Sequence, residues 1–277
     1  MRSGGAILVL LLAAILAAPW LLPAPDALDL VARFGPPSPE HPLGTDDLGR
    51  DIGARLAQGG VVSLSVAAVT ALLAALIGTL VGLLAGYHGG KADALLMRLT
   101  DGVMSLPLLP LLIVLAAADP AKLGVPPAMT ESEVFAVLRP AVIIACVAWT
   151  GVARLVRAAT LSVRSRDFVR AAEALGARPA RIMLRHILPN VASPIVVATT
   201  LSVGNIILIE SALSFLGLGI RPPLASWGNM LTGAMDVVWS APLLAFWPGA
   251  AIFVTVLGFN LLGDGLQKAL DPKRLSG

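Results

Sequence analysis

The chain has 277 residues, of which 57% are hydrophobic and only 13% are charged. A soluble domain carries about 25% charged residues, so this composition argues against a soluble protein and indicates a protein of the membrane. The formal net charge of +3 is small and its charges lie in loops, which argues against a nucleic-acid-binding surface.

Histidine and cysteine are too few and too scattered to suggest a metal site. His41, His88 and His186 lie far apart, and Cys146, the single cysteine, has no internal partner for a disulfide. Cys146 lies in an apolar run, which favours a small buried side chain. We therefore expect no permanent metal on this chain.

Six segments are apolar and close to the roughly 20 residues that a membrane-spanning helix needs. They are residues 6–22, 61–86, 103–118, 134–153, 191–218 and 241–263. The first also resembles a cleaved secretory signal, but its apolar run continues through Trp20, which favours a retained helix. The pattern predicts an all-α integral membrane protein with six transmembrane helices.

The segment between the first two apolar runs, residues 23–60, is too long for a tight connection. Its acidic and basic residues, among them Asp46, Asp47, Arg50 and Asp51, either bind a receptor or stabilise local structure by capping the next helix. Local structure is the favoured interpretation.

Small residues recur every four positions in the second apolar segment, at Gly78, Gly82 and Gly86. Such a stripe lets the backbones of two helices approach closely. We favour packing inside this chain over a contact between subunits. In the third segment, Pro107 and Pro110 predict a kinked or extended helix.

A basic loop, residues 161–190, separates the fourth and fifth apolar segments. If the N-terminus is cytoplasmic, this loop and most of the 20 basic residues lie on the cytoplasmic side, as the positive-inside rule requires. Both termini are then cytoplasmic. The chain divides into a first transmembrane helix (1–22), an extracytoplasmic segment (23–60), a transmembrane domain (61–265) and a cytoplasmic tail (266–277).

Within the basic loop the residue pattern predicts two short helices meeting at a turn. Asp167 is placed to cap the first helix, and Gly176 supplies the left-handed conformation that ends it. Pro179 can open the second helix, and Leu188 with Pro189 ends it. The small and apolar surface of the first helix suits docking into a groove of another protein.

Polar residues inside apolar segments are costly and therefore candidates for function. The candidates for a solute pathway or for helix packing are Asn205, Glu210, Ser214, Asn260 and Asp264. For Glu210 a structural role is favoured over an aqueous pathway, and for Asn260 and Asp264 a helix-packing hydrogen bond is favoured.

The basic loop resembles the "EAA" loop of permease subunits in binding-protein-dependent ABC importers. The resemblance lies in residues 168–176 and 187–190, where Ala171, Ala172 and Gly176 match the family pattern and Ile-Leu-Pro follows near the expected spacing. The first family glutamate is replaced by Arg170, and a glutamate stands three positions later at Glu173.

Two further stretches are similar to the dipeptide, oligopeptide and nickel group of these permeases, specifically its second, C-type subunit. The first is residues 41–51. The second consists of separate pieces near the C-terminal end, which match in order and spacing: residues 213–228, 248–249, 259–266 and 270–272. The resemblance implies the type I ABC importer permease fold, in the bacterial cytoplasmic (inner) membrane.

The same resemblance implies that the first loop helix is a coupling helix docking on an ATPase. The residues that carry it are Phe168, Arg170, Ala171, Ala172, Glu173, Leu175, Gly176, Ile187, Leu188 and Pro189. The implied partners are a homologous second permease, two ABC ATPases and an extracytoplasmic solute-binding protein, besides membrane lipid. Dipeptides or oligopeptides are the favoured solutes and nickel is the alternative.

No phosphate loop accompanies these features. The Gly90–Lys91 pair lacks the first glycine and the final Ser or Thr of that motif. ATP and magnesium therefore belong to the partner ATPases, and we expect no cofactor and no catalysis on this chain. The competing class is a channel or secondary transporter working alone, and such a protein would need no docking loop. A membrane-embedded enzyme is a weaker alternative still.

Overall fold

The computed structural model describes residues 2–270. The elements are α1 (Arg2–Leu21), α2 (Ile52–His88), α3 (Gly90–Ser105), α4 (Leu108–Ala117), η1 (Pro120–Leu123), α5 (Pro127–Thr130), α6 (Glu133–Arg164), α7 (Asp167–Ala174), α8 (Pro179–Ile182), η2 (Met183–Ile187), α9 (Leu188–Phe215), α10 (Trp227–Met235) and α11 (Leu243–Leu270). Across residues 2–270 the only β-type pairing is one isolated bridge between Thr45 and Asp51. The all-α prediction is confirmed.

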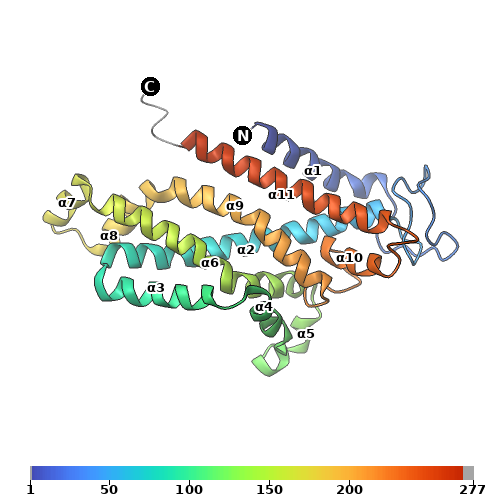
Figure 1. Ribbon diagram of the computed structural model, residues 1–277, viewed down its shortest axis with the longest axis horizontal. Coiled ribbons are helices and arrows are strands. Elements are labelled where there is room, and N and C mark those ends of the chain that lie inside the picture. Colours follow the sequence, from blue (N-terminus) through green and yellow to red (C-terminus); the bar gives the residue numbers. More distant parts are fainter. Residues whose placement is uncertain (1, 271–277) are drawn as a thin grey trace.

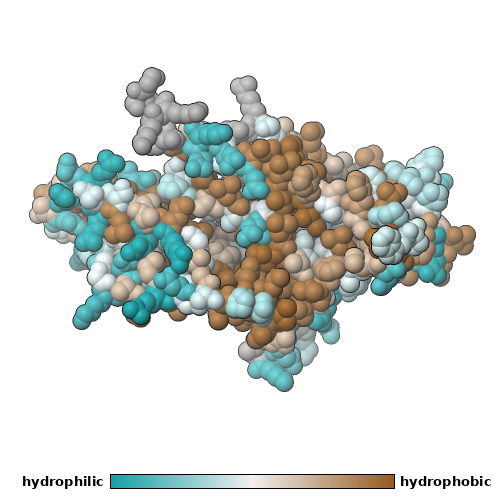
Figure 2. All heavy atoms as spheres, viewed as in Figure 1, coloured by the Kyte–Doolittle hydropathy of each residue, from teal (hydrophilic) through white to brown (hydrophobic). Residues whose placement is uncertain are grey.

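The long helices run side by side in an elongated bundle, with α7 at one end and the coil between α1 and α2 at the other (Figure 1). Among the described residues, five helical runs are long and apolar enough to cross a membrane: α1, α2, α6, the run from α8 to α9, and α11. Figure 2 shows hydrophobic residues concentrated across the middle of the molecule and hydrophilic residues at both ends. This distribution is the one that a bilayer requires.

The third predicted span is broken instead of continuous. Helices α3 and α4 meet at an angle of 89°, and together they make a sixth candidate span. Pro107 disfavours helical geometry in the residue before it, and Leu106 is accordingly extended, with φ −79° and ψ 138°. Pro110 lies in the first turn of α4, where a missing N–H costs little. The predicted kink is confirmed.

Several helices extend beyond their apolar segments. Helix α2 begins at Ile52 because the Asp51 carboxylate caps it, accepting a 2.7 Å hydrogen bond from Ala54 N. The predicted connection 23–60 is therefore shorter than expected. At the other end of the bundle, α6 continues to Arg164 and α11 to Leu270, so residues 266–270 of the predicted tail are helical. The rest of that tail, residues 271–277, lies outside the described residues.

Helix α2 lies at the centre of the bundle and packs on α6 along the glycine stripe. A Cβ built on Gly78 would lie 2.7 Å from Trp149 O, and one on Gly82 would lie 2.6 Å from Ala153 O. Gly86 faces Thr160 in the same way, at 2.7 Å. The stripe therefore serves packing inside this chain, as predicted. In contrast, Cys146 of α6 is exposed, so the expectation of a buried thiol was wrong: helix α6 turns this side chain away from the bundle.

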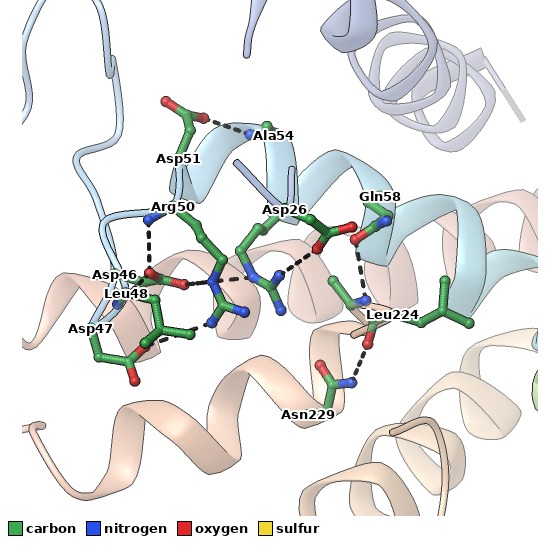
Figure 3. A network of polar contacts seen from close by, with 12 residues as sticks. Asp26, Asp46, Asp47, Leu48, Arg50, Asp51, Ala54, Gln58, Leu224 and Asn229 are labelled. Atoms are coloured by element: carbon green, nitrogen blue, oxygen red, sulfur yellow. Dashed lines mark hydrogen bonds and ion pairs between the residues drawn. The ribbon is translucent and has the colours of Figure 1, made fainter. Parts of the chain in front are cut away.

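The coil before α2 is held by a network of carboxylates and guanidinium groups (Figure 3). Asp46 accepts hydrogen bonds from the backbone N–H groups of Leu48 and Arg50 and from Arg50 Nε, at 2.7 to 3.0 Å. The buried Arg55 reaches both Asp46, at 3.6 Å, and Asp26, at 3.2 Å. These acidic residues build local structure, as favoured from the sequence.

Candidate functional site

The end of the bundle that carries α7 has the features expected of a docking surface. Helix α7 begins at Asp167, and its N-cap is Arg166, which makes no side-chain capping bond. The prediction that Asp167 caps this helix was therefore wrong. Asp167 lies one residue further in, where a carboxylate still interacts favourably with the helix dipole.

Helix α7 ends in a Schellman motif built on Gly176. Ala177 N donates to Ala172 O at 3.1 Å, and Gly176 N donates to Glu173 O at 2.9 Å. Gly176 has φ +75°, and a Cβ added there would meet no atom within 4 Å. The glycine is therefore required for its backbone conformation and not for lack of space. Pro179 is the first residue of α8, as predicted.

The two faces of α7 differ in burial. Val169 and Ala172, three positions apart, are buried against the bundle. The opposite face presents Arg170 and Ala171 to the outside, whereas Glu173, four residues after Val169, is exposed at the edge of the inner face. Two apolar side chains at the ends of the helix are exposed as well: Phe168 at 45% and Leu175 at 88%. Exposed apolar side chains of this size, next to arginines, are typical of a surface that a partner covers.

The inner face of α7 is fixed to three long helices at once. Val169 belongs to an apolar cluster with Leu83 of α2, Val156 of α6 and Val191 of α9. The Tyr87 hydroxyl at the end of α2 also donates to Glu173 at 3.4 Å. Helix α7 contacts α6, α8 and η2 directly, and it is joined to α2 and α9 through the same apolar cluster and the Tyr87–Glu173 bond.

The second loop helix does not end at Leu188 and Pro189 as predicted. Helix α8 continues through the π-helix η2 into α9, and the run Pro179–Phe215 is one 37-residue helix. Leu188 N donates to Met183 O in the wider π pattern, immediately before Pro189, which has no N–H to give. Asn190 Nδ2 donates to His186 O at 2.7 Å, which satisfies a carbonyl next to the irregular turn. Of the loop residues predicted near this point, Ile187 is buried and Pro189 is exposed.

Two of the polar candidates inside the spans are buried in this chain. Glu210 of α9 is fully buried and accepts a 2.7 Å hydrogen bond from the Ser214 hydroxyl. Ser63 of α2 and Ser226, the N-cap of α10, lie near the same carboxyl group, but its Oε2 atom has no hydrogen-bond partner within residues 2–270. The Oγ atoms of all three serines accept backbone N–H groups of the α9–α10 connection or of α10. Glu210 thus joins α9 to α2 and α10.

The other three candidates lie on the surface. Asn205 of α9 and both Asn260 and Asp264 of α11 are exposed. Within residues 2–270 none of the three side chains makes a hydrogen bond or ion pair, so the helix-packing bond expected for Asn260 and Asp264 is not formed there. Hydropathy alone did not separate these exposed residues from the buried Glu210.

A cavity of about 600 Å³ with both polar and apolar lining opens at the end of the bundle opposite α7. Its lining includes Asp46 and Arg50 from the coil before α2, and Ser214 and Asn229 from the Glu210 region. Sequence reasoning did not find it, because its walls come from segments far apart in the chain.

These features define a multi-pass membrane protein with a short, largely exposed helix, α7, at one end of its bundle. Residues 78–276 match the family described as "Binding-protein-dependent transport system inner membrane component". The chain belongs to this family, and the resemblance carried by its basic loop is confirmed at that level.

Among the curated relatives, the chain is 41% identical over 273 residues to a peptide permease protein of Brucella suis biovar 1 (strain 1330), covering 98% of this chain and 86% of the relative. It is 40% identical over 268 residues to a peptide transport system permease protein of the same organism, covering 96% and 85%. It is 36% identical over 238 residues to the oligopeptide transport system permease protein OppC of Bacillus subtilis (strain 168), covering 86% and 73%.

Proposed function

We propose that this chain is a permease subunit of an ATP-driven, binding-protein-dependent importer that moves dipeptides or oligopeptides across the bacterial inner membrane by alternating access. The family match and the peptide-permease names of its relatives support this proposal. A nickel permease is the alternative solute class, and no relative named above supports it.

The observation that carries the mechanism is the two-faced helix α7. Its outer face exposes Phe168 and Leu175, whereas its inner face is fixed to α2, α6 and α9. In this proposal an ATPase subunit covers the outer face, so α7 is the coupling helix and its end of the bundle is cytoplasmic. Closure of two ATPases on ATP then moves α7, and the movement reaches the membrane helices through the buried contacts.

The remaining parts of the importer are separate chains. ATP and magnesium bind the two ATPases, and no cofactor or catalytic group is assigned to this chain. A homologous second permease completes the membrane unit, and a solute-binding protein delivers solute at the end opposite α7. Both termini are cytoplasmic, in agreement with the distribution of basic residues.

A pair of substitutions at Gly176 tests the coupling role. Gly176→Val places a β-branched residue at φ +75°, which costs roughly 1–2 kcal/mol in the left-handed region. Gly176→Asn adds a side chain to the same open space, but asparagine tolerates this conformation. We expect the Val variant to lose ATPase co-purification and peptide uptake, and the Asn variant to keep most of both.

The measurement is made on the whole complex in membranes, with the amount of this chain quantified in each preparation. Equal ATPase recovery and equal uptake for the Val variant and the unmodified chain would contradict the coupling role of α7. Equal loss in both variants would show that any side chain at this position blocks docking, independent of the backbone.

A further inference from the structure

Helices α9 and α11 lie side by side in the bundle (Figure 1) and carry exposed carboxamide and carboxylate groups along their shared face. Asn205 belongs to α9, and Asn260, Asp264 and Gln267 follow one another at four- and three-residue steps on α11. This spacing places the α11 residues on one side of the helix. All four residues are exposed.

The two asparagines lie at the same depth in the bundle. A Cβ built on Gly204, next to Asn205, would lie 3.7 Å from Asn260 Oδ1. Asn260 precedes the last residue of α11, Leu270, by about 15 Å of helix at the standard rise. Both carboxamides lie within predicted apolar segments, residues 191–218 for Asn205 and 241–263 for Asn260, and therefore within the roughly 30 Å of hydrocarbon. Figure 2 shows hydrophilic side chains interrupting the apolar band on this side of the molecule.

These carboxamides differ in their hydrogen bonding from three hydroxyl side chains of α9. Thr199, Thr200 and Ser202 each donate to a carbonyl of their own helix at 2.8 Å. A hydroxyl can therefore face lipid at little cost. Asn205 and Asn260 make no hydrogen bond within residues 2–270, and a carboxamide exposed to hydrocarbon is strongly unfavourable. We therefore do not expect this face to contact the hydrocarbon chains of lipid.

We propose that the α9–α11 face carrying Asn205, Asn260 and Asp264 lines a water-filled pathway in which the two carboxamides bind the backbone amides of a passing peptide. A carboxamide offers both an N–H donor and a carbonyl acceptor, the same pair of groups that a peptide bond presents. Such pairing does not depend on the side chains of the peptide. Asp264, closer to the α7 end, supplies a carboxylate for the ammonium group at the peptide N-terminus. This inference rests on the proposed import function.

The first test replaces both carboxamides in the complete importer, reconstituted with its binding protein, and follows uptake of a labelled tripeptide. Asn205→Leu with Asn260→Leu removes the polar groups, and Asn205→Gln with Asn260→Gln keeps them as a matched control. We expect the Leu pair to lower uptake by about tenfold or more, equivalent to at least one lost hydrogen bond, while subunit composition stays unchanged. The Gln pair should recover most of the uptake.

Uptake by the Leu pair at the level of the unmodified importer would overturn the pathway assignment. Release of the second permease from the Leu pair would overturn it too, since it would show that this face is a subunit contact. A complex of unmodified subunits that hydrolyses ATP but accumulates no peptide would instead refute the proposed function, and the amide pairing with it.

A second test measures water at this face without relying on transport. The single cysteine, Cys146, is replaced by alanine, and Asn260→Cys is compared with Leu12→Cys, an exposed apolar position of α1. In membranes carrying the full complex, a water-soluble maleimide should label position 260 and not position 12. Failure to label position 260 in both the ATP-bound and ATP-free complex would overturn the water-filled pathway.

Discussion

The close contact between α2 and α6 makes a quantitative prediction at Gly82. Adding one methyl group by Gly82→Ala would place the new Cβ 2.6 Å from Ala153 O, 2.7 Å from Val156 Cβ and 2.9 Å from Arg157 N. Two of these three atoms are backbone and cannot move without moving α6. The helices must therefore separate by several tenths of an ångström along this part of the stripe.

A matched substitution isolates the steric cost. Gly151 lies in α6, and a Cβ there would meet no atom within 4 Å. Each Gly→Ala change in a helix interior gains about 1 kcal/mol in helix propensity, so this gain cancels when the two variants are compared. Overpacking costs typically 1–3 kcal/mol. Gly82→Ala should therefore be less stable than Gly151→Ala by about 1–3 kcal/mol, and Gly151→Ala itself should be more stable than the unmodified chain.

The assay is the free energy of unfolding of the purified chain in mixed micelles, obtained from a denaturing-detergent titration followed by tryptophan fluorescence. Equal stability of the two variants would refute the reasoning, because it would mean that α2 and α6 are not held at the distance described. If Gly151→Ala lowered the free energy of unfolding as much as Gly82→Ala, the steric explanation would also be contradicted, since a Cβ at Gly151 meets no atom within 4 Å.

Two further substitutions test the polar contacts that fix the end opposite α7. Asp51→Ala should lower the free energy of unfolding by about 1 kcal/mol through loss of the α2 cap, and Asp51→Ser should restore most of it; no difference between Ala and Ser would show that the cap contributes nothing. Glu210→Ala should cost about 1–3 kcal/mol because the buried Ser214 hydroxyl loses its acceptor, and Glu210→Gln should cost less in the same titration. A Gln variant as unstable as the Ala variant would indicate that the charge, and not the acceptor oxygen, is what the site needs.

The sequence predicted best those features that depend on local backbone chemistry. Gly176 and Pro179 specify the end of α7 and the start of α8 through φ alone, and both are found where expected. The break before Pro107 follows from the same kind of steric rule. The start of α2 at Ile52 was missed because the predicted span was taken from hydropathy, whereas the helix begins at a cap in polar sequence.

The sequence could not specify the continuation from α8 into α9. A proline after a loop helix normally marks its end, but here the helix passes Pro189 directly after the π turn η2, in which Leu188 N bonds to Met183 O five residues back. Such a turn depends on tertiary packing, here the burial of Ile182 and Ile187 against the bundle. The residue pattern around Pro189 does not predict that packing.

The polar residues inside the spans show a different limit of prediction from sequence. In a membrane protein an apolar residue suits both lipid and the protein interior, so hydropathy does not reveal which face of a helix points inward. The sequence grouped Asn205 and Glu210 as polar candidates, and only the structure shows that Glu210 is enclosed and Asn205 is exposed. Glu210 links α9 to α2 and α10, whereas Asn205 is exposed, as its proposed contact with solute requires.

A single helical run, Pro179–Phe215, joins the proposed docking end to the proposed solute pathway. Helix α8 lies beside α7 in the apolar cluster, and its continuation α9 carries Asn205 in its middle and Glu210 near its far end. Because the run is continuous, a displacement at the α7 end must shift Asn205 relative to α11, unless the helix bends at η2. The contact of α9 with α2 and α10 at Glu210 holds the far end in place. In the proposed importer, movement at one end and restraint at the other would tilt α9 and open the proposed pathway toward one side of the membrane at a time.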